Sequence, residues 1–233
     1  MREISFPGES AEYRAARAEL LAAEHGLTRH IEAVARMRRA LPPGGAVPQD
    51  YPFTEGPADL DTDEPVRTTR LSELFGSHGT LLVYNFMYGP EMAEPCPMCT
   101  SVLDGLDGSM PDIRVRAGIA VVAKSPIARI RAFARTRGWV NTRLLSSADN
   151  TYNRDYHGEN GKGEQESMLN VFVRRGDEIR HFYGTEKGSS EPGQDDRHVD
   201  LIWPLWNALD LTPDGRGGEW RPSYPPKSVT SVR

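Results

Sequence analysis

Two cysteines placed directly after an apolar run constrain this chain more than any other feature of its sequence. The run, residues 80–87, carries no charge and is rich in Leu, Val, Tyr and Phe, which predicts a strand buried on both faces. Cys96 and Cys99 follow after a short loop, and the apolar residues beyond them recur with helical spacing. A C-x-x-C motif between a strand and a helix indicates redox chemistry.

The spacing of the two thiols suits that chemistry. Two thiols at positions i and i+3 of a first helical turn can close a small disulfide ring without unfolding the helix. Cys96 would also lie where unpaired backbone N–H groups and the helix dipole favour a thiolate over a thiol. The common alternative is half of a structural zinc site, but no second C-x-x-C pair is present to complete one.

Length and charge narrow the remaining classes of protein. A chain of 233 residues with a formal net charge of −5 can form one sizeable core, and no basic face favours nucleic acid or an anionic membrane. The longest apolar run is far shorter than the ~20 residues of a membrane-spanning helix. The N-terminus lacks the apolar region of a secretory signal. We therefore expect a cytoplasmic protein without a cofactor, acting on a small-molecule or protein disulfide and re-reduced by a partner that the sequence does not identify.

Composition divides the chain into three parts. Residues 1–65 are expected to form an N-terminal helix and an extended wrap, residues 66–211 the main domain, and residues 212–233 an irregular tail rich in Gly and Pro. Ser10 is a plausible N-cap for the long helix. Its apolar stripe is narrow, so we expect it to contact the main domain or a second copy of the chain, as in a homodimer.

The main domain alternates strands and helices before it ends in a hairpin and a helix. This order is typical of an α/β thioredoxin-like three-layer fold with a central mixed sheet, whose active site follows the first long strand. Ser125 is expected to cap the second helix and Pro204 to bend the last one. The polar loop at residues 148–165 is expected to be exposed. The strands are predicted at residues 80–87, 118–124, 143–147, 168–173 and 178–184, and the helices at residues 96–106, 126–137 and 198–209.

Several stretches also resemble a known family. They are residues 83–90 (VYNFMYGP), Cys96–Thr100 (CPMCT), Arg137-Gly138-Trp139 and residues 209–216 (LDLTPDGR). With the charged N-terminal helix, they resemble the thioredoxin-like predicted dithiol-disulfide oxidoreductases that carry a domain of unknown function, number 899. The resemblance implies a thioredoxin-like fold and dithiol chemistry.

Two stretches depart from the usual pattern. Thioredoxins place a cis-proline just before the hairpin, where this chain has Ser167-Met168-Leu169, and the acidic segment at residues 189–198 replaces the family's Ser- and Tyr-containing stretch. The edge that receives a substrate is therefore expected to differ, and the substrate to be small.

The motif assigns a role to each cysteine. Cys96, nearest the helix N-terminus and the more exposed, is expected to attack a disulfide or another oxidised substrate, and Cys99 to resolve the mixed disulfide. Substrate contacts are expected from Pro97, which stiffens the turn, from the apolar Met98, and from Met168 at the position usually taken by the cis-proline.

Two other functions remain open from the sequence. The dithiol with a histidine, most plausibly His157, would form a soft-metal site for Cu(I) or Zn²⁺ in a binding protein. More weakly, a fold of this kind can serve an unrelated reaction of specialised metabolism, because fold does not fix function.

Overall fold

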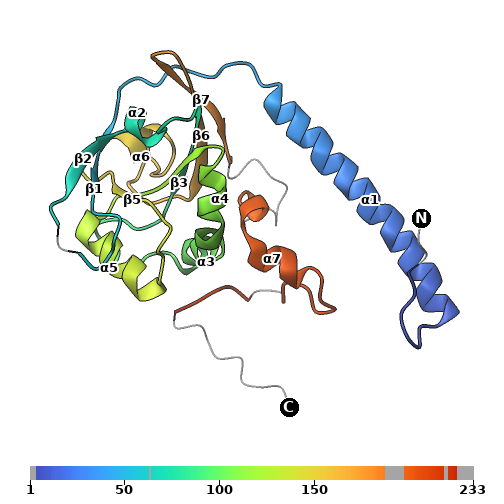
Figure 1. Cartoon of the computed structure of the whole chain (residues 1–233). Helices are drawn as coiled ribbons and strands as arrows, with labels where there is room; N and C mark the ends of the chain where they lie inside the picture. The colour runs from blue at the N-terminus through green and yellow to red at the C-terminus, as the bar shows by residue number, and fades with distance from the viewer. Residues whose placement is uncertain (1–3, 63, 187–196, 218–219, 225–233) are drawn as a thin grey trace. The chain divides into compact units, whose positions relative to one another are not determined.

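The computed structural model describes residues 4–62, 64–186, 197–217 and 220–224. The chain divides into two compact units, Met1–Pro42 and Pro43–Arg233. The second unit contains the β-sheet and every described helix after α1 (Figure 1). Across the described residues, no helix combines the length and the apolar character needed to span a bilayer.

The first unit consists mainly of helix α1, Ala11–Arg39, which continues through Gly26. Ser10 is its N-cap, as predicted, and its hydroxyl oxygen accepts a hydrogen bond from the Tyr13 N–H at 3.0 Å. None of the residues of α1 is buried. Its apolar stripe is therefore exposed in a single chain, with Leu27 at 59% of its full accessibility.

The second unit is built on one mixed sheet of seven described strands in the order β2-β1-β5-β4-β3-β6-β7. Strands β3, β4 and β5 are parallel, as right-handed crossovers predict, whereas β6 and β7 form an antiparallel hairpin beside β3. The strands are β1 (Pro52–Glu55), β2 (Arg67–Arg70), β3 (Thr80–Asn85), β4 (Gly118–Ala123), β5 (Leu144–Ser146), β6 (Met168–Arg175) and β7 (Glu178–Gly184).

Residues alternate between the two faces of this sheet and fill a core on each. On β3, Tyr84 belongs to one buried cluster and Val83 to the other. The first cluster packs beneath α3, α5 and α7, and the second beneath α2 and α6, so helices cover both faces. The helices are α2 (Leu71–Leu74), α3 (Pro97–Leu106), α4 (Met110–Arg114), α5 (Ile127–Arg137), α6 (Tyr152–Asp155) and α7 (Pro204–Leu209).

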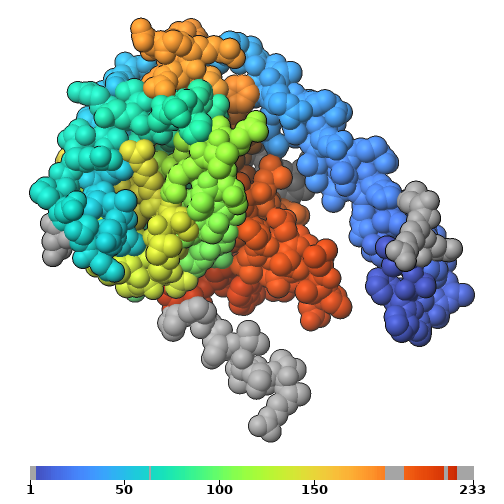
Figure 2. Space-filling view, in the orientation of Figure 1, coloured from blue at the N-terminus to red at the C-terminus, as the bar shows by residue number. Residues whose placement is uncertain are grey.

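This arrangement is the thioredoxin-like α/β fold that the sequence predicts. The strands β4-β3-β6-β7 are neighbours in the sheet, and α3, which follows β3, begins at the C-x-x-C motif. Residues 43–65 join the same unit and supply β1, which pairs with β2 and β5. Helix α7 lies alongside α3 (Figure 2). The two helices are so close that a Cβ atom on Gly105 of α3 would lie only 3.1 Å from the Pro204 ring of α7.

Two predicted helix starts are wrong because a proline takes a different position from the one expected. Pro126, not Ser125, is the N-cap of α5, and the Ser125 hydroxyl instead donates to the Gly89 carbonyl at 2.9 Å. Pro204 does not bend a helix but begins α7, after a separate 3₁₀ turn at Asp200–Ile202. The end of α5 is as predicted, since Gly138 takes the left-handed conformation with φ of 70°.

The loop at residues 148–165 is exposed only in part, although its polarity predicts an exposed segment. Tyr152 and Asn153 are buried, and α6 packs against the sheet. A chain of buried amides holds the loop down, because the Asn153 oxygen lies 3.5 Å from the Asn85 amide and its own amide donates to Gln165 at 3.2 Å. Much of the predicted irregular tail, residues 218–219 and 225–233, falls outside the described residues, as does most of the acidic segment.

Neither edge of the described sheet presents a long, unpaired strand. Strand β2 is four residues long, with exposed arginines at its two ends, Arg67 and Arg70. At the other edge the backbone of residues 45–47 pairs with β7, through bonds from the Val47 N–H to the Ile179 carbonyl at 2.9 Å and from the His181 N–H to the Gly45 carbonyl at 3.0 Å.

The carboxylate of Asp107 ties the end of α3 to the segment before β5. It accepts hydrogen bonds from the Asn141 backbone at 3.1 Å and from the Thr142 hydroxyl at 2.6 Å, while only 8% exposed. Asp107→Asn would turn an amide donor toward these donors and should lower the free energy of unfolding by about 1–3 kcal/mol. Urea denaturation measures this, with the exposed Asp112→Asn as control; equal midpoints for the two variants would contradict the assignment.

Candidate active site

Cys96 is fixed at the junction between the central strand and α3. It is the N-cap of α3, and its backbone N–H donates to the Met87 carbonyl at 3.0 Å. Its own carbonyl accepts from the Thr100 backbone N–H at 3.0 Å, and Pro97 occupies the first helical position. The motif therefore begins the helix as the sequence predicts, with Cys96 on the first turn.

The two cysteines are not joined by a disulfide, and their surroundings differ. Cys96 is partly exposed, whereas Cys99 is only 4% exposed. The hydrogen bond with Cys96, burial and the charge of Cys96 raise the pKa of Cys99 well above its usual range, in that order of importance. Of the pair, Cys99 therefore keeps its proton and can donate it toward Cys96.

A cavity of about 80 Å³ adjoins the dithiol. It brings together the end of β3, the start of α3, the residue before β6 and the segment before α7. Of the five predicted site residues, Cys96, Met98 and Cys99 line it, and Pro97 and Met168 do not. The lining residues are Tyr84, Met87, Cys96, Met98, Cys99, Val102, Ser167, His198, Val199 and Trp203.

Ser167, rather than Met168, reaches the cavity from the position before the hairpin. Met168 is 8% exposed, and its sulfur accepts a hydrogen bond from the Thr185 hydroxyl at 3.5 Å. Because side chains alternate along a strand, the two neighbours point to different surroundings.

The hydroxyl of Tyr84 is buried beside the Cys99 thiol. It lies close enough to interact electrostatically with both cysteines, yet makes no hydrogen bond of normal geometry. Burial and then the proximity of Cys99 raise the pKa of Tyr84 well above its usual range, so the hydroxyl stays protonated. The sequence places Tyr84 within a strand predicted to be buried, and its ring does lie in the core. The hydroxyl gives it a place in the site as well.

The histidine at the dithiol is His198, and not the His157 that the sequence suggests. Its Nε2 lies 3.0 Å from the Ser167 hydroxyl, and its buried Nδ1 has no hydrogen-bond partner. His157 follows Tyr156, which belongs to the hydrophobic cluster on the other face of the sheet. Within the described ranges, no three His, Cys, Asp or Glu side chains are placed to hold a metal ion.

The signal that could have found His198 is topological. The segment before the final helix of a thioredoxin-like fold returns to the helix that carries the dithiol. Here the Trp203 indole N–H donates to the Ser101 hydroxyl at 3.1 Å, which brings the segment around His198 against α3.

Comparison with solved structures finds chains of low sequence identity. Thioredoxin peroxidase I of Plasmodium yoelii is 15% identical, with 78% of this chain and 100% of that chain covered at a TM-score of 0.47. Enterococcus faecalis AhpC is 9% identical, with 72% of this chain and 95% of that chain covered at a TM-score of 0.46. The peroxiredoxin-like protein of Aquifex aeolicus is 16% identical, with 71% of this chain and 88% of that chain covered at a TM-score of 0.43.

Comparison with curated proteins finds no match. A family model described as "bacterial protein of unknown function (DUF899)" matches residues 5–230, almost the whole length of the sequence. The chain therefore belongs to this family.

Proposed function

We propose that this protein is a thiol–disulfide oxidoreductase that reduces a small oxidised substrate, with Cys96 as nucleophile and Cys99 as resolving thiol. The observation that carries the proposal is the asymmetry of the pair. The partly exposed Cys96 lies at the N-terminus of α3, and the buried Cys99 beside it retains its proton.

The reaction runs in two exchanges. The Cys96 thiolate attacks one sulfur of a substrate disulfide, forming a mixed disulfide and releasing the other sulfur as a thiolate that takes up a proton. Cys99 then loses its proton and attacks the Cys96 sulfur, which closes the Cys96–Cys99 disulfide and releases the second substrate thiol. Two electrons pass from the dithiol to the substrate, while Cys99 supplies one proton and solvent supplies the other. A reducing thiol partner must restore the dithiol.

The surroundings of Cys99 support its role in the second exchange. The Tyr84 hydroxyl and the Met87 backbone N–H each lower the pKa of Cys99, against the stronger effects that raise it. Both groups can donate to the sulfur of Cys99 when it becomes a thiolate. We assign Tyr84 the role of stabilising the resolving thiolate.

The size of the cavity supports a small substrate. About 80 Å³ beside the two sulfurs accommodates a small group, and Met98 and Trp203 give it an apolar wall. The cytoplasm, where such thiols are kept reduced, is the compartment that we propose for this chemistry.

Substitution of each cysteine should separate the two exchanges. Cys96→Ser is expected to abolish turnover of cystine or oxidised glutathione, because the nucleophile is lost. Cys99→Ser should retain the first exchange and accumulate a mixed disulfide, visible in intact-protein mass spectrometry as an added substrate half that a reductant removes. Wild-type turnover by Cys96→Ser would remove the nucleophile assignment.

Loss of the Tyr84 hydroxyl should slow the second exchange selectively. Because the pKa of Cys99 lies above its usual value, closure of the disulfide should accelerate as pH rises. Tyr84→Phe removes a group that lowers this pKa, so its profile should shift to higher pH, with closure about tenfold slower at neutral pH. Rapid-quench alkylation measures closure.

Tyr88→Phe is the matched control, since Tyr88 lies in the same hydrophobic cluster but does not line the cavity. An unchanged closure profile in Tyr84→Phe would refute the role of Tyr84 and leave the roles of the two cysteines standing.

A further inference from the structure

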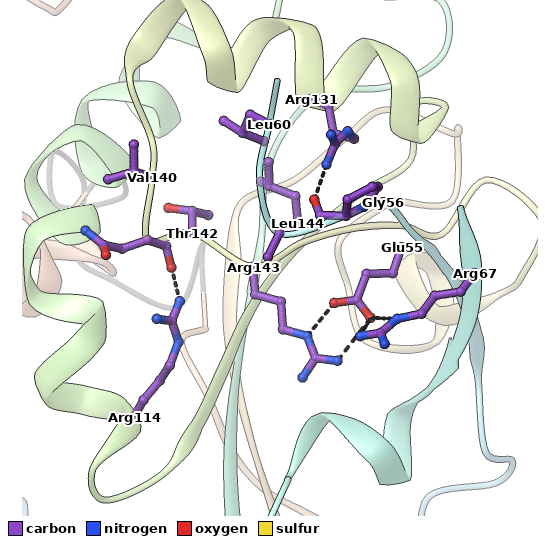
Figure 3. A pocket seen from close by; sticks show the side chains of 13 residues that line it. Glu55, Gly56, Leu60, Arg67, Arg114, Arg131, Val140, Thr142, Arg143 and Leu144 are labelled. Carbon is purple, nitrogen blue, oxygen red and sulfur yellow. Dashed lines mark hydrogen bonds and ion pairs between the residues drawn. The ribbon is translucent and has the colours of Figure 1, made fainter. Parts of the chain in front are cut away.

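A second cavity, of about 290 Å³, is lined in part by β5, which is separated from β3 by β4 (Figure 3). Leu144, the first residue of β5, lines it, whereas the dithiol follows the last residues of β3. Leu144 pairs with Val121 of β4, which pairs with Tyr84 of β3, so the two cavities lie two strands apart, and they share no lining residue. The cavity is therefore a separate site, and its argument does not rest on the proposed function.

The walls of this cavity carry an excess of positive charge. Four arginines line it, and Glu55 is the one acidic residue in the lining. The acidic Asp59 and Glu64 line a neighbouring hollow instead. The arginines are Arg67, Arg114, Arg131 and Arg143.

Glu55 neutralises only part of this charge. Its carboxylate is buried at 6% exposure and accepts hydrogen bonds from Arg143 at 2.7 and 3.0 Å and from Arg67 at 3.0 and 3.2 Å. Burial alone would raise the pKa of Glu55, but bonds from Arg143 and Thr69 and the two positive charges bring it below the usual value. One carboxylate thus faces two guanidinium groups, which it also holds in place.

The other two arginines bind neutral groups. Arg131, 7% exposed, donates to the main-chain carbonyls of Pro57, Asp59 and Thr62. Arg114 donates to the Asn141 carbonyl. A carbonyl satisfies an N–H donor without cancelling its charge, so both cations remain uncompensated by any carboxylate in the lining.

Two features suit the free space to an organic anion. In Figure 3 the guanidinium groups of Arg114 and Arg143 lie below Val140, Thr142 and Leu144. Arg143 bonds Glu55 through Nε and one Nη2 hydrogen, so its Nη1 group stays available for an oxyanion. Val140 and Leu144 add an apolar surface beside these donors.

We propose that this cavity binds a small organic anion through a carboxylate or phosphate group held by Arg114 and Arg143. The apolar part of the ligand lies against Val140 and Leu144. Calorimetric titration of the full-length protein with acetate, benzoate, inorganic phosphate and phenylphosphate tests this. Benzoate or phenylphosphate is expected to saturate with a Kd of about 1 mM or tighter, and to bind better than its small counterpart. The better of the two identifies the acidic group.

Variants at exposed positions keep the test independent of folding. Arg114→Gln removes one cation, and Val140→Glu adds a repelling charge at a residue that is 76% exposed. Each should weaken binding about tenfold or more. Arg116→Gln, at an exposed residue outside the cavity, should bind as wild type does.

Two results would overturn the proposal. One is the failure of all four anions to saturate the wild-type protein. The other is equal weakening by Arg114→Gln and Arg116→Gln, which would show a general effect of net charge. Thermal unfolding of each variant verifies that it is folded.

Discussion

A main-chain hydrogen bond between Met87 and Cys96 positions the dithiol, and the rest of the site depends on this contact. The Met87 carbonyl accepts a hydrogen bond from the Cys96 N–H at 3.0 Å, and the Met87 N–H lowers the pKa of Cys99. Met87 follows the central strand β3, which is paired on both sides by β4 and β6. A rigid, doubly paired strand therefore fixes the position of the two thiols, and a shift of β3 would change both the exposure of Cys96 and the protonation of Cys99.

The sequence predicts most of the fold because its signals are local. The uncharged run before the cysteines, the buried strand at β4 and the hairpin each carry a pattern readable within a few residues. The burial of Tyr152 and Asn153 in the loop at residues 148–165 could not be predicted in this way, because long-range contacts bury them and no periodicity marks them. The role of Pro204 could not be predicted for another reason. A proline is compatible both with a bend in a helix and with the start of one, and the tertiary packing decides between them.

The residues of the candidate site also differ in whether a local sequence pattern predicts them. The cysteines and Met98 come from one contiguous motif, so their proximity follows from sequence. Ser167 and His198 reach the dithiol only through the return of the chain after β5 and after β7, and no local pattern marks them. Tyr84 illustrates a further limit, because one residue serves the core with its ring and the site with its hydroxyl. The sequence pattern marks the burial of the ring but does not indicate where the hydroxyl lies.

The treatment of the sheet edges has a consequence for behaviour at high concentration. A long exposed edge strand is a template on which a second molecule can add its own strand, and such addition leads to aggregates. Here the backbone of residues 45–47 already pairs with β7, and β2 is short and flanked by arginines. Intermolecular strand addition therefore meets a paired edge on one side and a short strand with a charged residue at each end on the other. At the β7 edge, the pairing with residues 45–47 thus occupies backbone groups on which another molecule could otherwise add a strand.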